Sequence, residues 1–283
     1  MHITHSNTIY FNFSNAGTST GFKSNTMFDK SLGILTKVST SLFVRLQRDR
    51  REVHVNIVAV EICGQRILDM LRPNKSAWGN GNIFVACDES GYVRIRNATK
   101  VRVKSADEMI ETCMNALRRR GMINAGGGHV SNTKHKDTSV VISVSINRHN
   151  DKDEKNCVDG KITLVDLADS DTPRAHNDDL SLDNARSNLR ALTKVTEALS
   201  TNVSKTLIPY KNDLLTNSLQ DCIGGNAKTC FLVCVDSDES NLKETLEAFE
   251  YSRKIRDVRN ETHRVADLDT IMRLQNELKS KKK

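Results

Sequence analysis

The sequence predicts an α/β fold in which one sheet is covered by helices. Strand-like runs of alternating or continuous apolar residues recur along the chain, helical spacing of apolar residues recurs between them, and we find no internal repeat. A chain of 283 residues buries roughly three quarters of its unfolded surface, which is sufficient for one large core or two smaller ones. A hydrophobic content of 37% excludes a disordered chain, and only 3 prolines exclude a proline-rich linker.

Strands and helices alternate through the first half of the chain. Alternating apolar residues such as Val53, Val55 and Ile57 are typical of a strand, whereas apolar residues three and four apart indicate a helix. In chain order these patterns predict a strand at 8–13, a helix at 33–47, a strand at 53–62, a short helix at 67–71, a buried strand at 83–86 within a polar loop at 74–91, strand residues at 92–103 and a helix at 105–120. Pro73 is expected to close the short helix, because proline lacks the N–H that a helix interior needs.

The second half continues the alternation and ends in a polar tail. Two apolar runs separated by a polar stretch predict a hairpin, and Leu189, Leu192 and Val195 fall on one face of the helix that follows. The predicted elements are strands at 139–146 and 161–167, helices at 183–200 and 212–222, a strand at 229–235, a helix at 240–256 and helical residues from 267 onward.

Composition and charge limit the classes of partner and compartment. Lys and Arg number 42 against 35 Asp and Glu, and the resulting net charge of +7 favours an anionic partner. No run approaches the roughly 18 apolar residues of a membrane span, and the first residues lack the pattern of a secretory signal, so we expect no membrane partner and no secretion. No stacking or groove-reading motif supports nucleic-acid binding. The expected compartment is cytoplasmic or nuclear.

The cysteines do not predict a disulfide framework. They number 7, an odd count, and none of them forms a CxxC pair. Cys230 and Cys234 lie in one apolar run, where strand alternation places both on the same face, and we expect them to be buried thiols.

Three motifs of the second half carry a resemblance to a known family. Residues 161–168 read Lys-Ile-Thr-Leu-Val-Asp-Leu-Ala, residues 208–211 read Ile-Pro-Tyr-Lys, and residues 219–229 read Leu-Gln-Asp-Cys-Ile-Gly-Gly-Asn-Ala-Lys-Thr. With the helical segments 188–199 and 244–254, they follow the order and spacing of the kinesin motor domain. The chain resembles that family over about residues 8–260.

The resemblance implies a fold, a domain division and an open sheet edge. The expected architecture is the three-layer kinesin motor fold, which is similar to P-loop NTPases, with a central mixed sheet flanked by helices and without the first strands of the family. Residues 1–262 would form the motor-like domain, incomplete at its N-terminus, and residues 263–283 a neck. In the family the missing strands cover the edge beside the strand at 229–235, so that apolar edge is expected to be unpaired here. Either the sequence is a fragment, or something else covers the edge.

The tail at 263–283 has two interpretations. Leu268, Ile271 and Leu278 are spaced like the a and d positions of a coiled coil, which would supply a dimer partner. An ordinary solvated tail fits the same residues.

The resemblance also implies a site for ATP and Mg²⁺. Residues 17–24 align with the phosphate-binding loop of the family, whose glycines let backbone N–H groups close around phosphate, whose lysine reaches the β- and γ-phosphates and whose last hydroxyl binds Mg²⁺. The expected nucleotide-binding residues are Gly17, Thr18, Ser19, Thr20, Gly21, Phe22, Lys23 and Ser24, with Ser24 as the Mg²⁺ ligand. Phe22 and Thr20 replace glycines of the family pattern, and a Cβ there obstructs close approach to phosphate.

The segments that sense the γ-phosphate in the family have changed as well. The catalytic residues that the resemblance implies are Asp166 near the Mg²⁺ shell and the pair Lys136–Asp171, which would replace an Arg–Glu bridge. Lysine makes no bidentate contact with a carboxylate, so that pair is weaker than the one it replaces. Asp169 stands where the family has a glycine whose N–H faces the phosphate, and a carboxylate there repels it.

A basic surface is expected to face an acidic polymer. In the family, the helix after residue 180 and the segment that follows it contact the microtubule, whose tubulin subunits are acidic. The expected microtubule-binding residues are Arg186, Arg190, Lys194, Lys205 and Lys211. Leu214 and Asn217 stand where the family has a lysine and an arginine, so two contacts are lost. Without the resemblance, the same charges are typical of a solvated helix face.

These observations lead to a functional hypothesis and two alternatives. The chain is expected to be a kinesin-like microtubule-binding protein of the cytoplasm and cytoskeleton, from the ATP-dependent motor family, with impaired ATP hydrolysis. One alternative is an active microtubule-stimulated ATPase that moves along microtubules. The other is a truncated gene product without a stable fold. Whether the chain is an enzyme is left open by the sequence.

Overall fold

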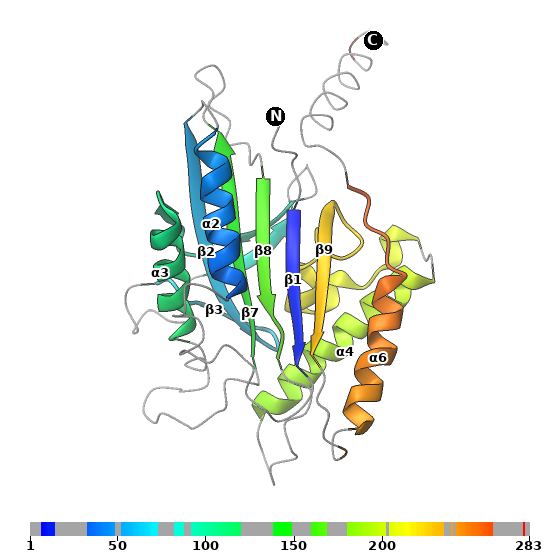
Figure 1. The fold of residues 1–283 in the computed structure, drawn as a ribbon. Helices are drawn as coiled ribbons and strands as arrows, with labels where there is room; N and C mark the ends of the chain where they lie inside the picture. The colour runs from blue at the N-terminus through cyan, green and yellow to red at the C-terminus, as the bar shows by residue number, and fades with distance from the viewer. Residues whose placement is uncertain are drawn as a thin grey trace.

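The computed structural model describes residues 7–14, 33–48, 52–72, 82–87, 92–119, 138–148, 160–168, 180–201, 204–234, 239, 242–262 and 280. Within these ranges, seven strands form one sheet and two strands form a second, smaller sheet (Figure 1). None of the described helices is long and apolar enough to cross a membrane.

The main sheet is mixed, as predicted. Its strands are β1 (Asn7–Ser14), β2 (Val53–Cys63), β3 (Arg66–Asp69), β6 (Val101–Val103), β7 (Ser139–Arg148), β8 (Gly160–Asp166) and β9 (Ala227–Cys234). Their order is β3-β2-β7-β8-β1-β9, and β6 also pairs with β2. β1 is parallel to both of its neighbours, whereas β7 is antiparallel to β8 and to β2. Among the described strands, β9 is at the sheet edge, where the sequence places an open edge.

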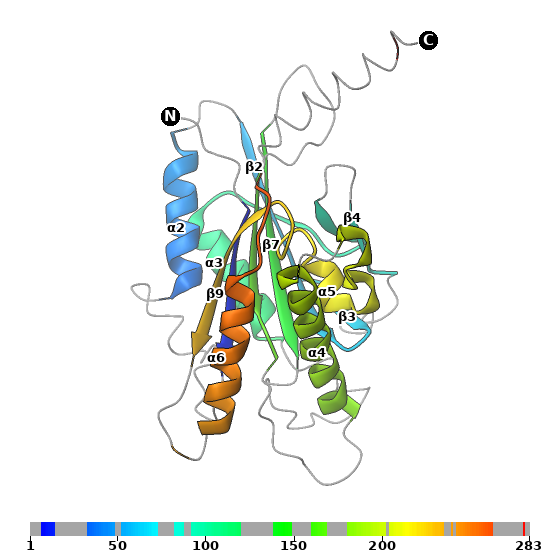
Figure 2. The same ribbon diagram turned by 90° about the vertical axis from the view of Figure 1, so that its right-hand side faces the viewer.

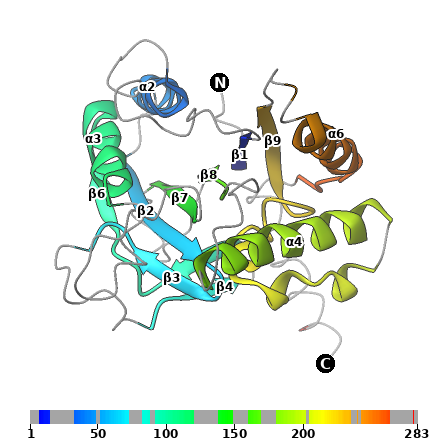
Figure 3. The same ribbon diagram turned by 90° about the horizontal axis from the view of Figure 1, so that it is seen from below.

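Helices cover both faces of this sheet. They are α2 (Ile34–Leu46), α3 (Ala106–Leu117), α4 (Leu180–Ser200), α5 (Leu214–Ser218) and α6 (Leu242–Arg256), with the short 3₁₀ helices η3 (Lys205–Leu207) and η4 (Tyr210–Asn212) between α4 and α5. α2 and α3 lie on one face and α4 and α5 on the other (Figure 2). Seen from below, α6 runs alongside β9, on the same side of the sheet as α4 (Figure 3). This is the expected three-layer arrangement.

The two faces of the sheet bury two separate cores. Alternation along a strand sends successive side chains to opposite faces. Val55 and Ile57 of β2 therefore pack with Met109 of α3 on one side, while Ile62 packs with Leu192 of α4 on the other. A chain of this size thus divides its apolar residues between two cores that share one sheet.

The prediction of a short helix at 67–71 is wrong, because this segment forms β3. β3 pairs with the end of β2 through a two-residue turn in which Gly64 adopts a φ of 57°. A left-handed residue is easiest for glycine, and it lets the chain reverse immediately after β2. The strand pairing between β2 and β3 then stabilises this segment more than a short helix with a few apolar residues on one face would.

Three further expectations need correction. The strand predicted at 83–86 is β4 (Phe84–Cys87), but it is not buried: it pairs with β5 (Val93–Arg96) in the small sheet and leaves Phe84 50% exposed. The helix predicted at 212–222 is regular only over α5, because the chain then enters a turn with Gly224 at a φ of 76°. Cys230 is exposed, because its neighbour Phe231 in the edge strand β9 packs against the core with Leu192 and alternation turns Cys230 to the other face. Cys234 lies at the end of β9, and its side chain is outside the described set.

Candidate functional site

The carboxyl ends of three parallel strands meet at the same end of the sheet, which is called the carboxyl edge below and is distinct from the edge strand β9. β8, β1 and β9 all end there, and β7, which is antiparallel to β8, begins there (Figure 1). Asp166, the catalytic residue predicted near the Mg²⁺ shell, is the last residue of β8 and is buried between Asn12 of β1 and Val140 of β7 in the strand register. The topology therefore brings together the strand ends that flank the predicted nucleotide segments. Those segments themselves, residues 17–24 with Lys136 and Asp171, lie outside the described residues.

Two buried hydrogen bonds fix the beginning of β7 at this edge. The Oγ of Ser139 accepts from the backbone N–H of Ala168 at 3.0 Å, which ties β7 to the residues that follow β8. The hydroxyl of Thr138 donates to the Oε1 of Glu61 in β2 at 2.5 Å. Both contacts join residues far apart in the chain, and sequence reasoning missed all three side chains. They hold the two strand ends next to the predicted phosphate-sensing segments in one position.

Of the residues that the resemblance assigns to Mg²⁺ and ATP, the structure describes only Asp166. Mg²⁺ prefers oxygen ligands in near-ideal octahedral geometry, and phosphate needs close backbone N–H groups. In the part of the chain that the structure describes, no group of three His, Cys, Asp or Glu side chains is placed to hold a metal ion. The sequence adds Phe22 in the phosphate loop and Asp169 where an N–H should face the γ-phosphate. These departures in the sequence, and not the geometry of the described residues, argue against ATP hydrolysis.

The second candidate surface is the outer face of α4. Leu192 and Val195 are fully buried, and four-residue spacing places Arg190 and Lys194 together on the exposed face of the same helix. Lys211, in η4, is also exposed. The other two predicted microtubule-binding residues are Arg186 in α4 and Lys205 in η3, and their side chains lie outside the described set.

A buried asparagine fixes the position of α4. The Oδ1 of Asn188 accepts from the N–H of Gly64 at 2.7 Å, and its Nδ2 donates to the carbonyl of Gly64 at 3.2 Å and to the Oδ2 of Asp213 at 2.7 Å. Asp213 in turn caps α5 by accepting from the N–H of Leu215 at 2.9 Å. One side chain therefore joins α4, the β2–β3 turn and the start of α5.

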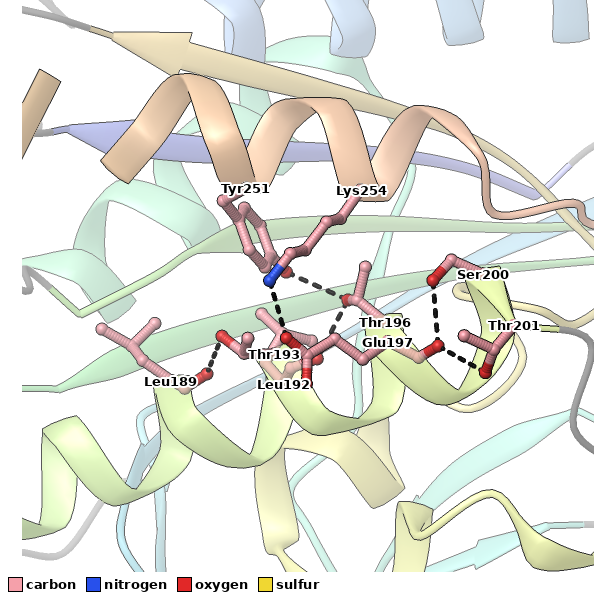
Figure 4. Close-up of polar contacts among 9 residues, drawn as sticks. All are labelled: Leu189, Leu192, Thr193, Thr196, Glu197, Ser200, Thr201, Tyr251 and Lys254. Atoms are coloured by element: carbon pink, nitrogen blue, oxygen red, sulfur yellow. Dashed lines mark hydrogen bonds and ion pairs between the residues drawn. The ribbon is translucent and has the colours of Figure 1, made fainter. Parts of the chain in front are cut away.

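The other half of α4 is held by α6 (Figure 4). The ammonium of Lys254 lies 2.7 Å from the Oε1 of Glu197, and the hydroxyls of Tyr251 and Thr196 are 3.3 Å apart. Burial raises the pKa of the Tyr251 phenol, so that hydroxyl stays protonated. The exposed ion pair contributes little, but the buried contact completes the packing between the two helices.

The motif at residues 219–229 is held by an asparagine after α6. The Nδ2 of Asn260 donates to the carbonyls of Cys222 and Ala227, each at 2.7 Å, and its Oδ1 accepts from the N–H of Gly224 at 2.7 Å. The turn that ends in β9 therefore depends on a residue that follows α6. The motif precedes β9 and enters its first residues, so it lies at the opposite end of that strand from the carboxyl edge of the sheet.

Comparison with known proteins gives one family. Residues 7–258 match the family model described as the kinesin motor domain. A kinesin-like protein KIN-14I from Oryza sativa subsp. japonica is 28% identical over 86% of the chain, and the human chromosome-associated kinesin KIF4B is 28% identical over 82% of it. In both cases the match spans 19% of the relative's own length. A solved structure titled as a fast kinesin has a TM-score of 0.73 at 22% identity, covering 92% of this chain and 73% of the other. That likeness supports the fold.

Proposed function

This chain belongs to the kinesin motor-domain family, and from that premise we propose that it binds microtubules while its own ATP hydrolysis is impaired. The observation that carries the proposal is that α4 is held in place with basic side chains exposed. The helix is fixed by Asn188 at one half and by α6 at the other, and it presents Arg190 and Lys194 to solvent. The departures from the family pattern at Thr20, Phe22 and Asp169 fall instead on residues that would handle phosphate.

The binding would be electrostatic, and it would place the protein at the cytoskeleton. Tubulin is acidic, and exposed lysine and arginine side chains at the rim of an interface mainly steer association and set its salt dependence. Leu214 and Asn217 stand where the family has basic residues, so we expect weaker binding than the family pattern would give. We further propose that residues 263–283, in which Leu268, Ile271 and Leu278 have the spacing of a coiled coil, form a dimerising segment.

The main test combines polymer binding with nucleotide binding. The purified chain, shown to be folded by circular dichroism, would be co-sedimented with microtubules and titrated with Mg·ATP in a calorimeter. We expect co-sedimentation without measurable heat from Mg·ATP. Tight Mg·ATP binding with microtubule-stimulated phosphate release would replace this proposal by the active motor. A folded chain that binds neither polymer nor nucleotide would contradict both functions.

The active motor remains the second candidate because four residues of the family pattern are retained. Asp166 occupies the end of β8 at the edge where the β1 and β9 strands also end, and Gly17, Lys23 and Ser24 of the phosphate loop agree with the family pattern. If these residues suffice, the altered loop would still close around phosphate. Microtubule-stimulated phosphate release, measured beside the Mg·ATP titration, separates this case from the first.

Charge reversal on α4 should weaken the interaction with microtubules. The double variant Arg190→Glu/Lys194→Glu places two acids against an acidic polymer, so the apparent Kd in co-sedimentation at low salt should rise about tenfold or more. The matched control is Lys37→Glu/Arg45→Glu, which reverses two exposed charges on α2 at the opposite face of the sheet. Equal losses in the two double variants would mean that only net charge matters, and the assignment of α4 would be wrong.

A further inference from the structure

The basic face of α4 contains one acidic side chain. Arg190, Lys194 and Glu197 follow one another at spacings of four and three residues, which aligns all three along the exposed face of the helix. The side chain of Glu197 is 48% exposed, so its carboxylate can be reached by a partner that docks on this face. Because tubulin is acidic, a carboxylate at this position opposes the proposed interaction.

A residue of α6 holds this carboxylate. The Nζ of Lys254 lies 2.7 Å from the Oε1 of Glu197, and the lysine reaches across from α6 to α4 to make the contact (Figure 4). Within the described ranges, Glu197 has no second basic partner, and neither Arg190 nor Lys194 forms an ion pair. The charges of Arg190 and Lys194 are therefore available to a partner, whereas the charge of Glu197 is matched by a neighbouring helix.

The other charges of α6 do not replace Lys254 in this contact. Glu247 and Glu250 are exposed acids, and Glu250 precedes Lys254 by four residues, a spacing at which ion pairs form on a helix. Among the residues that the structure describes, neither acid pairs with a basic side chain. Arg253 points about 100° away from Lys254 around the helix axis. Loss of the Lys254 ammonium would therefore leave Glu197 without a basic partner, beside a helix that carries two further exposed acids.

We propose that Lys254 is a positioning residue for microtubule binding, because it holds the carboxylate of Glu197 toward α6 and so keeps the exposed face of α4 basic. The inference rests on the proposed function and extends its surface beyond α4. The pair has little effect on folding, since an exposed ion pair contributes little to stability. In binding, the same pair determines whether a carboxylate faces an acidic polymer within a Debye length, where the repulsion is not screened.

Co-sedimentation of the full chain with microtubules at low salt tests the proposal. Lys254→Met keeps an unbranched aliphatic side chain but removes the charge, so it should raise the apparent Kd about threefold or more. Lys254→Arg keeps a cation within reach of Glu197 and should bind like the unaltered chain. The control Lys37→Met removes an exposed charge from α2, on the opposite face of the sheet, and should have a clearly smaller effect.

A double-variant cycle shows whether Lys254 acts through Glu197. If it does, Lys254→Met should cost little affinity in a chain that already carries Glu197→Gln, because no carboxylate remains to be held. Glu250→Gln makes the same change in net charge on α6, and in that background the loss from Lys254→Met should persist. An equal loss from Lys254→Met with and without Glu197 would make the lysine an independent contact and would overturn the proposal.

Salt dependence separates this role from a structural one. The loss caused by Lys254→Met should shrink as salt rises, because the exposed carboxylate is then screened, whereas a displaced α4 would bind poorly at any salt concentration. An unaltered, folded chain that does not co-sediment contradicts the proposed function together with this inference. A chain that loses affinity in Arg190→Glu/Lys194→Glu but not in Lys254→Met contradicts the inference alone.

Discussion

Replacing Asp221 with alanine is expected to lower the free energy of unfolding by about 3–5 kcal/mol, the largest single effect that this structure predicts. The Oδ2 of Asp221 lies 2.7 Å from the Nζ of Lys161 in β8, and both side chains are almost completely buried. The same oxygen accepts from the N–H of Val93 at 3.0 Å, and Lys161 donates to the carbonyl of Val93 at 2.9 Å. Without the carboxylate, the lysine charge remains buried and its partner is lost.

A buried thiol extends this network. Burial, together with the adjacent Asp221 carboxylate, raises the pKa of Cys222 well above its usual value, so the thiol stays protonated and donates to the Oδ1 of Asp221 at 2.8 Å. The two carboxylate oxygens are therefore both satisfied. An alanine at 221 leaves three donors without this acceptor, which adds a desolvation cost to the unpaired lysine.

Denaturant unfolding at neutral pH measures the effect, and two variants make it specific. The double variant Lys161→Met/Asp221→Leu removes both charges, so it should cost clearly less than Asp221→Ala alone. Lys254→Ala breaks the exposed pair with Glu197 and should cost less than about 1 kcal/mol. If Asp221→Ala cost no more than Lys254→Ala, the buried pair would not have the role that its geometry indicates.

The order of strands and long helices was predictable because each carries its own periodic signal. β2, β7 and β8 are apolar runs, and α4 shows its buried face in Leu192 and Val195. β3 was not predicted as a strand, since four residues show too little of either period and its pairing with β2 depends on the turn at Gly64. Cys230 was expected to be buried because strand alternation does not indicate which face of a strand is covered by a helix.

Residues of the candidate sites were predictable only where they belong to a family motif. Asp166 and Arg190 were located through the family motifs, and the structure places the first at the end of β8 and the second on the exposed face of α4. No motif indicates the contacts that Asn188, Glu61 and Ser139 make. Their partners are 25 to 124 residues away in the chain, so only the folded topology brings them together.

Asn188→Ala is expected to lower the free energy of unfolding by about 2–4 kcal/mol, the second of the two largest effects. Asn188 is 1% exposed, and its amide is the partner of both backbone groups of Gly64 and of the Asp213 carboxylate. Alanine leaves these buried groups without that partner, and a carboxylate that loses a hydrogen bond costs more than a neutral group. Denaturant unfolding measures the loss, with Ser187→Ala, an exposed neighbour on α4, as the control.

The same variant tests how the position of α4 affects microtubule binding separately from the effect of its charge. Asn188→Ala leaves Arg190 and Lys194 in place, so a loss of microtubule binding at a temperature where the variant is still folded would come from a displaced or mobile helix. The β2–β3 turn and the cap of α5 lose their common anchor at the same time, so all three elements should loosen together in hydrogen exchange. Asn188→Asp sharpens the test, because it keeps an acceptor for the Gly64 N–H but sets one carboxylate against that of Asp213. At neutral pH this isosteric change should be at least as damaging as alanine. A stable, tightly binding Asn188→Asp chain would mean that the position of α4 does not depend on this asparagine.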